Sequence, residues 1–194
     1  MYEEEIERLV ETENSDGLVE LGTTLFRDGA EETAFECYKA ACKLGNTVAM
    51  GNLGYCYQFG KGVKINYRLA AYCYERAGER DDPRSLMTLG DFYYKGKGDI
   101  PKDPVRAVQY FQRACELASG QVDPDEMLQA QTHYRMAVCH KNGVGGTPDY
   151  EAAYEHYQAA AEAIAERASY GDLQAQKLLS RAEDGMNECE THFE

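Results

Sequence analysis

Small and apolar residues recur along the chain in a pattern that repeats at a fixed interval. Leu53-Gly54 is followed 36 positions later by Leu89-Gly90, and Gly60-Lys61-Gly62 is followed at the same interval by Gly96-Lys97-Gly98. No segment shows the alternation of apolar and polar residues that predicts a strand. Self-similarity at one such period is typical of an array of stacked helical units.

A second apolar pattern recurs in each unit and follows the glycine pair where that pair is present. It is an alanine, an aromatic residue four positions later and another alanine three positions after that, which together lie on one face of a helix. The four copies are Ala34/Tyr38/Ala41, Ala70/Tyr74/Ala77, Ala107/Phe111/Ala114 and Ala153/Tyr157/Ala160. Each unit is therefore predicted to be a helix, a Gly-x-Gly turn and a second helix.

Capping signals place the ends of these helices. Asn66, Asp103 and Asp149 each stand four positions before the first alanine of a triad, and such side chains accept from the free N–H groups of a first turn. Asp82-Pro83 and Asp123-Pro124 give the same signal for two first helices. The predicted helices cover residues 4–13, 17–28, 31–43, 47–59, 66–78, 83–95, 104–118, 124–141, 149–168 and 172–186.

The array is expected to have distinct ends, as repeat arrays often do. Residues 1–16 are predicted to form an acidic N-terminal capping helix, residues 17–168 about four helix pairs, and residues 169–194 a C-terminal capping helix with an acidic tail. The first unit lacks the Gly-x-Gly turn, and the fourth carries an insertion from Ser119 to Asp125.

The second unit carries a resemblance to a known family. The resemblance is carried by the pattern Gly45-x3-Ala49-x3-Leu53-Gly54-x2-Tyr57-x2-Gly60-x-Gly62-Val63-x2-Asn66-x3-Ala70-x3-Tyr74-x2-Ala77. This pattern resembles the Sel-one-like repeat, a relative of the tetratricopeptide repeat. The 36-residue spacing favours it over the tetratricopeptide repeat, whose period is 34. The resemblance covers about residues 18–182, and Ala137 and His140 depart from it in the fourth unit. It implies an all-α, right-handed α/α solenoid of about four helix-turn-helix repeats with terminal capping helices.

The resemblance also implies a non-enzymatic protein–protein interaction adaptor or scaffold, which binds a protein or peptide segment on the concave face formed by the first helices. By analogy with the tetratricopeptide groove, the exposed positions on that face are Gly51, Tyr55, Gln58, Phe59, Met87, Asp91, Tyr94, Lys95, Tyr134, Val138, Lys141 and Asn142. The candidate binding residues among them are Tyr55, Gln58, Asp91, Tyr94, Lys95, Tyr134 and Lys141. Tyrosine rings are expected to supply contact area, and Asp91, Lys95 and Lys141 to fix the polarity of the bound segment.

Two alternatives stay open. The array can self-associate through an edge or an unpaired cap without a separate ligand, which a concentration-dependent mass would reveal. It can also be an accessory in which the loop at residues 119–125 supplies a ligand-binding or enzymatic role, which a deep pocket with convergent polar groups would indicate.

Small residues in the middle of the first helices predict a close helix contact. Gly54, Gly90 and Ala137 are equivalent, and a mid-helix glycine costs about 1 kcal/mol relative to alanine. Such a cost is tolerated where a neighbouring helix leaves no room for a side chain. Alanines of the second helices, such as Ala70, are expected to face them.

Composition and charge narrow the classes of partner. Hydrophobic residues make up 43% of the chain, enough for a core, and the net charge of −14 disfavours nucleic acids and anionic membranes. The apolar runs are too short for membrane insertion, and the acidic N-terminus lacks the apolar stretch of a secretory signal. A cytoplasmic location is therefore expected.

The seven cysteines are expected to be packing residues. Their number is odd and no pair has CxxC spacing, which argues against a disulfide framework and a zinc knuckle. Six occupy equivalent positions in different units, namely Cys37 with Cys73, Cys42 with Cys115 and Cys56 with Cys139. Equivalent positions are spread along a solenoid, so no metal site and no cofactor are expected.

The remaining candidates for chemistry are weak. The Gly-Lys-Gly turns lack the Ser or Thr that follows the lysine of a phosphate-binding loop. His133 and His140 share a helix face but have no carboxylate partner in the pattern, so they are expected to pack in the core. No nucleophile elbow, HExxH motif or dinucleotide fingerprint occurs, so an enzyme is not expected.

Overall fold

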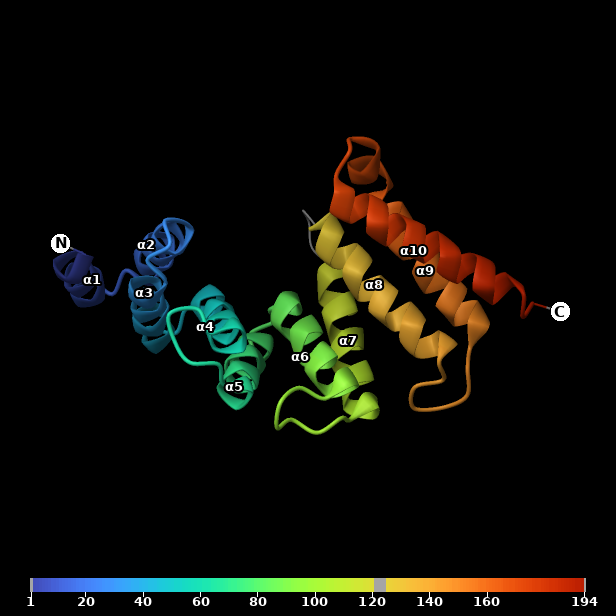
Figure 1. The fold of residues 1–194 in the computed structure, drawn as a ribbon, viewed down its shortest axis with the longest axis horizontal. Coiled ribbons are helices and arrows are strands. Elements are labelled where there is room, and N and C mark those ends of the chain that lie inside the picture. The colour runs from blue at the N-terminus through green and yellow to red at the C-terminus, as the bar shows by residue number, and fades with distance from the viewer. Residues whose placement is uncertain (1, 121–124, 194) are drawn as a thin grey trace. The chain divides into compact units, whose positions relative to one another are not determined.

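The computed structural model describes residues 2–120 and 125–193, which form helices joined by short turns (Figure 1). These residues contain no strand and one isolated bridge, between Lys97 and Ile100. None of their helices is both long and apolar enough to cross a bilayer. The helices are α1 (Tyr2–Glu11), α2 (Ser15–Arg27), α3 (Glu31–Lys43), α4 (Thr47–Phe59), α5 (Tyr67–Gly78), α6 (Pro83–Lys95), α7 (Pro104–Ser119), α8 (Glu126–Lys141), α9 (Tyr150–Ser169) and α10 (Leu173–Glu190).

The all-α prediction is confirmed, and α3, α4 and α6 have the predicted bounds. The last helix, α10, continues to Glu190, past the predicted end, and its last turn buries Cys189. The predicted Asp123-Pro124 signal lies outside the described residues. Helix α8 follows Asp125 instead, whose carboxylate accepts from the Leu128 N–H at 3.1 Å.

Polar caps start most of the helices, because each side chain satisfies a backbone donor that the first turn leaves free. The predicted caps are confirmed where a side chain accepts from the residue three positions later, at Asn66, Asp82, Asp103 and Asp149. The turn after α4 depends on glycine: Gly62 has a φ of +68°, and a Cβ there would lie 2.2 Å from the Glu31 carbonyl oxygen.

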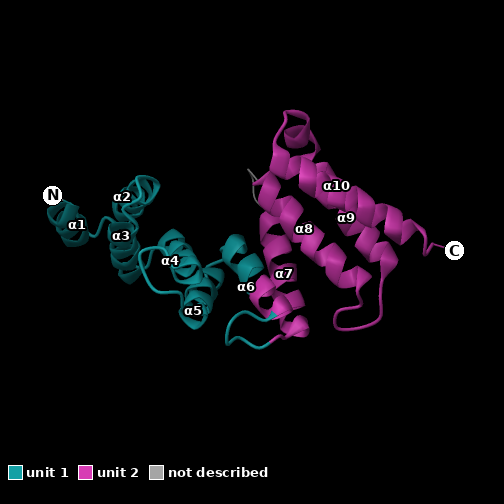
Figure 2. Cartoon of the chain, in the orientation of Figure 1, with its two compact units in different colours: residues 1–89, 96–101 teal, residues 90–95, 102–194 magenta. Residues whose placement is uncertain are grey.

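The structure divides into two compact units (Figure 2). Unit 1 comprises residues 1–89 and 96–101, unit 2 comprises residues 90–95 and 102–194, and the boundary falls within α6. The core of unit 1 contains large side chains, among them Leu25, Phe35 and Leu53. The core of unit 2 is richer in alanine and surrounds Tyr157, which is 1% exposed. The small residues let α8, α9 and α10 pack closely.

The predicted close contacts at small mid-helix residues are present in the second and third repeats. A Cβ at Gly54 would lie 2.6 Å from the Tyr74 ring, and one at Gly90 would lie 2.4 Å from the Phe111 ring. The group that fills the space is thus the aromatic ring of the triad. The first repeat has the same contact, which the sequence pattern did not reveal, between Gly22 and the Tyr38 ring.

Candidate functional site

Unit 1 has a cavity of about 360 Å³ between α4 and α6. Its walls come mainly from these two first helices, with Tyr74 contributed by α5. Gly51 and Tyr55, both predicted for the binding face, line it. The other lining residues are Val48, Asn52, Asp82, Arg84, Ser85 and Thr88.

An exposed aromatic cluster borders this cavity. The Tyr55 ring is 42% exposed and contacts the rings of Phe26 and Phe59, at centroid distances of 5.9 and 4.6 Å. Phe59 is 51% exposed. Gln58, the other residue predicted in this unit, accepts a hydrogen bond from the Tyr74 hydroxyl at 2.8 Å. Unit 1 therefore presents apolar contact area beside a partly polar hollow.

Two of the predicted charges of unit 2, those of Asp91 and Lys141, already have partners within the protein. Arg135 donates from Nε and Nη2 to the two carboxylate oxygens of Asp91, at 2.7 and 2.9 Å. Both side chains are about a quarter exposed. This ion pair raises the pKa of the Arg135 guanidinium. Asp91 is thus held inside the protein. Lys95 is exposed at the end of the same helix, α6.

Lys141 and Tyr134 come together through Tyr157 of α9. The Tyr134 ring packs edge-on against the Tyr157 ring, and the Lys141 ammonium lies 5.9 Å above that ring. Lys141 also pairs with Glu188 of α10. Tyr134 in turn accepts a hydrogen bond from Arg181 at 2.9 Å. Both predicted residues therefore fasten α10 to the helix pair α8 and α9.

Two further predicted positions are satisfied by local contacts. The Tyr94 ring lies 6.3 Å from the Phe111 ring, and its hydroxyl is 3.5 Å from the Asn142 amide nitrogen. Met87, which the repeat register placed on the exposed face, is 9% exposed, so its nomination is wrong.

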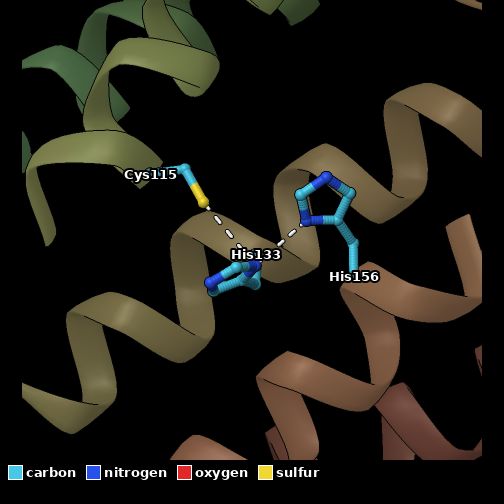
Figure 3. A group of neighbouring side chains, drawn as sticks. All are labelled: Cys115, His133 and His156. Carbon is cyan, nitrogen blue, oxygen red and sulfur yellow. Dashed lines mark hydrogen bonds between the residues drawn. The ribbon is translucent and has the colours of Figure 1, made fainter. Parts of the chain in front are cut away.

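Unit 2 also contains a cluster of one thiol and two imidazoles that the sequence analysis did not assemble (Figure 3). Cys115 comes from α7, His133 from α8 and His156 from α9. The Cys115 Sγ lies 3.6 Å from the His133 Nδ1, and the two Nδ1 atoms lie 3.0 Å apart. All three atoms are within 4.8 Å of one another. The His140 ring stacks on His156, with 14° between the planes.

Burial controls the protonation of this cluster. It lowers the pKa of His156 to about 4, with smaller contributions from His133 and His140, and it lowers the pKa of His133. It raises the pKa of the Cys115 thiol. In the protein without a ligand, both imidazoles are therefore neutral at pH 7 and the thiol is protonated.

The other thiols match the predicted packing role. All seven cysteines are unpaired, and six of them are buried. Burial raises the pKa of Cys37, Cys56 and Cys139 to about 11. A thiol in such surroundings stays protonated and is a poor nucleophile.

Comparison with known proteins identifies the repeat. The Sel1 repeat model matches residues 17–46, 47–82, 83–119 and 130–163. The chain belongs to the Sel1 repeat family. Among solved structures, it resembles a Sel1 repeat protein from Oxalobacter formigenes, with a TM-score of 0.70 and 26% identity over 90% of this chain and 64% of that one.

Two curated relatives are much longer than the matched segment. Chitin synthase regulatory factor 4 of Schizosaccharomyces pombe is 31% identical over 108 residues, or 55% of this chain. The ERAD-associated E3 ubiquitin-protein ligase component HRD3B of Arabidopsis thaliana is 29% identical over 122 residues, or 62% of this chain. The match covers 17% of each relative.

The thiol–imidazole cluster could have been predicted from the alignment of the Sel1 repeats. Cys115 lies late in the second helix of one repeat, whereas His133 and His156 lie on the two helices of the next repeat. Positions that are not equivalent, on consecutive helices, converge in a stacked array. Comparing equivalent positions, such as Cys42 with Cys115, does not bring these three residues together.

Proposed function

We propose that this Sel1 repeat chain is a non-enzymatic adaptor, and that unit 1 binds a segment of a partner protein at the cavity between α4 and α6. The observation that carries the proposal is the exposed aromatic cluster at the mouth of that cavity. Large aromatic side chains supply contact area at low entropic cost and dominate the binding energy of many protein interfaces.

The walls of the cavity offer a peptide both apolar and polar contacts. Val48, which is 61% exposed, and Tyr55 offer apolar surface to a side chain of the partner. The Asn52 carboxamide has no hydrogen-bond partner among the residues that the structure describes. Because a carboxamide both donates and accepts, it matches the N–H and C=O groups of an extended backbone.

The relatives support a role in assemblies and not a particular partner. Their printed names describe a regulatory factor and a component of a ligase. By analogy with these two relatives, we propose that this chain has a protein partner. The unpaired cysteines support a reducing compartment such as the cytoplasm, because buried free thiols persist where disulfides are not favoured.

Substitution of two exposed tyrosines of the same repeat tests the binding surface. Tyr55→Ala removes the aromatic side chain at the cavity, whereas Tyr72→Ala removes one from α5 that is 60% exposed and does not line it. We would first identify and purify the proteins that both the native chain and Tyr72→Ala retain from a lysate. Each of these proteins should bind Tyr55→Ala about 30-fold more weakly than it binds the native chain.

Circular dichroism must show that both variants keep their helical content. Equal affinity of the native chain and Tyr55→Ala for the purified partner would place binding elsewhere. A mass that rises with concentration, in the absence of any retained protein, would favour self-association instead.

A further inference from the structure

The cluster of Cys115, His133 and His156 has the dimensions of a transition-metal site. Zinc binds thiolate sulfur at about 2.3 Å and imidazole nitrogen at about 2.0–2.1 Å, so two ligands of a tetrahedral ion lie about 3.4 Å apart for two nitrogens and about 3.6 Å for sulfur and nitrogen. The observed separations are 3.0 Å for the two Nδ1 atoms and 3.6 Å for Sγ and Nδ1 of His133. To admit an ion, the two Nδ1 atoms would need to move apart by a few tenths of an ångström. The third distance, between the ligand atoms of Cys115 and His156, is within 4.8 Å and would need to shorten by about 1 Å.

The second nitrogen of His133 is held in the arrangement that a metal ligand needs. Its Nε2 lies 3.3 Å from the Ser119 hydroxyl oxygen. When Nε2 carries the proton and donates it to Ser119, the Nδ1 lone pair of His133 points at the cluster. An outer hydrogen bond that fixes the tautomer is the usual companion of a histidine ligand.

The contacts of the cluster converge on one atom, the Nδ1 of His133. In that tautomer, the single lone pair on Nδ1 of His133 faces both the Cys115 Sγ and the Nδ1 of His156. The Cys115 thiol also has hydrogen-bond partners in Thr132 and Ser119. One lone pair cannot make two well-directed hydrogen bonds at once. A cation at the centre would instead bind three lone pairs, one from each residue.

We propose that Cys115, His133 and His156 bind one zinc-class transition-metal ion through Sγ and the two Nδ1 atoms. One thiolate and two imidazoles are ligands of borderline softness, which zinc accepts and magnesium or calcium does not. Binding releases the thiol proton to solvent, and no oxidation or reduction occurs. The ion joins α7 of one repeat to α8 and α9 of the next.

A fourth coordination position is left for water. A cavity of about 410 Å³ adjoins the cluster, and Cys115, Ser119, His140 and His156 are among its walls. It provides a path for the ion and room for a water ligand. His140 stacks on His156 and is not one of the three converging residues, so its imidazole is not required.

Titration of the untagged chain of residues 1–194 with zinc chloride and cobalt chloride tests the proposal. Calorimetry should show one zinc ion per chain, and Co²⁺ should give a thiolate-to-metal charge-transfer absorption together with the intense visible bands of tetrahedral cobalt. Saturating zinc should raise Tm by about 5 °C, because the ligand binds only the folded state.

Matched variants separate this site from other thiols and imidazoles. Cys115→Ser should abolish the charge-transfer absorption, and His133→Leu, which places the leucine of the third repeat at this position, should weaken zinc binding at least 100-fold. Cys139→Ala and His192→Gln remove a thiol and an imidazole outside the cluster and should bind zinc as the native chain does.

A labelling experiment on the native chain avoids any dependence on folded variants. Zinc should slow the alkylation of Cys115 relative to Cys42, as measured by mass spectrometry of peptides. The proposal is overturned if zinc fails to protect Cys115, if no 1:1 complex forms, or if Cys115→Ser and His133→Leu, both still helical, bind zinc like the native chain.

Discussion

Two pairs of equivalent positions show how one repeat serves differently in the two units. Tyr55 and Thr88, on consecutive first helices, line the cavity of unit 1. Their equivalents in unit 2 are Asp91 and Arg135, which form a bidentate ion pair. The repeat fixes where these side chains meet, and their chemistry decides whether the place is open to a partner or closed by an internal contact.

The thiol–imidazole cluster gives a second contrast of the same kind. In unit 1 the positions equivalent to Cys115, His133 and His156 hold Cys42, Met50 and Cys73. Burial raises the pKa of Cys73 to about 12, and the Met50 sulfur accepts a hydrogen bond from Arg80 at 3.0 Å. Replacing two soft apolar side chains by imidazoles thus turns a packing site into a set of converging ligands.

The largest effect is expected where the second and fourth repeats differ in helix contact. In unit 1, Gly54→Ala would place a Cβ within 3 Å of three Tyr74 ring atoms, and this ring is 5% exposed. The hydrogen bond from the Tyr74 hydroxyl to Gln58 holds the ring in place, so overpacking should outweigh the gain in helix propensity. We expect a loss of about 2 kcal/mol in unfolding free energy, measured by urea denaturation.

The clash can be tested directly by shrinking the ring. Tyr74→Leu destabilises the native chain by itself, but in the Gly54→Ala background it should cost less than in the native background. Additive effects of the two substitutions would show that the ring does not cause the loss.

A smaller loss of unfolding free energy is expected when the Asp91–Arg135 ion pair of unit 2 is broken. Asp91→Ala leaves the Arg135 guanidinium, which is about a quarter exposed, without its carboxylate. Removing one partner of a partly buried pair should lower the unfolding free energy by about 1.5 kcal/mol, as measured by urea denaturation.

The double variant Asp91→Tyr/Arg135→Thr, which copies the residues of unit 1, is the control. It leaves no unpaired charge, so it should be more stable than Asp91→Ala. A double variant that is less stable than Asp91→Ala would mean that packing, and not the unpaired charge, sets the cost.

The helices could be predicted from the sequence because their signals are local. Asn66, Asp103 and Asp149 mark helix starts by a hydrogen bond to the residue three positions later, and the glycine pairs mark the turns. The close contact at Gly54 was also predictable, since only a nearby helix explains a glycine at that position. Residues within one turn of each other decide the helix starts and the turns.

The candidate site was less predictable because it depends on which side chains meet across helices. The register placed Asp91 and Lys141 on the binding face, but it carries no information that Arg135 and Glu188 would pair with them. The pattern likewise gave His133 a place on a helix face without the second helix that brings His156 to it. Pairing between helices is a property of the packed array.

The smallest effect is expected at the position of the fourth repeat that corresponds to Gly54. Ala137 is fully buried, and the Tyr157 ring lies instead against Gly185 of α10, where a Cβ would be 2.5 Å from it. The fourth repeat therefore has room for a methyl group that the second lacks. Ala137→Gly should lower the unfolding free energy by about 1 kcal/mol, through lost helix propensity and a lost apolar contact. Urea denaturation would contradict this explanation if Ala137→Gly were as stable as the native chain or more stable, because the glycine would then be favoured in both repeats for the same reason.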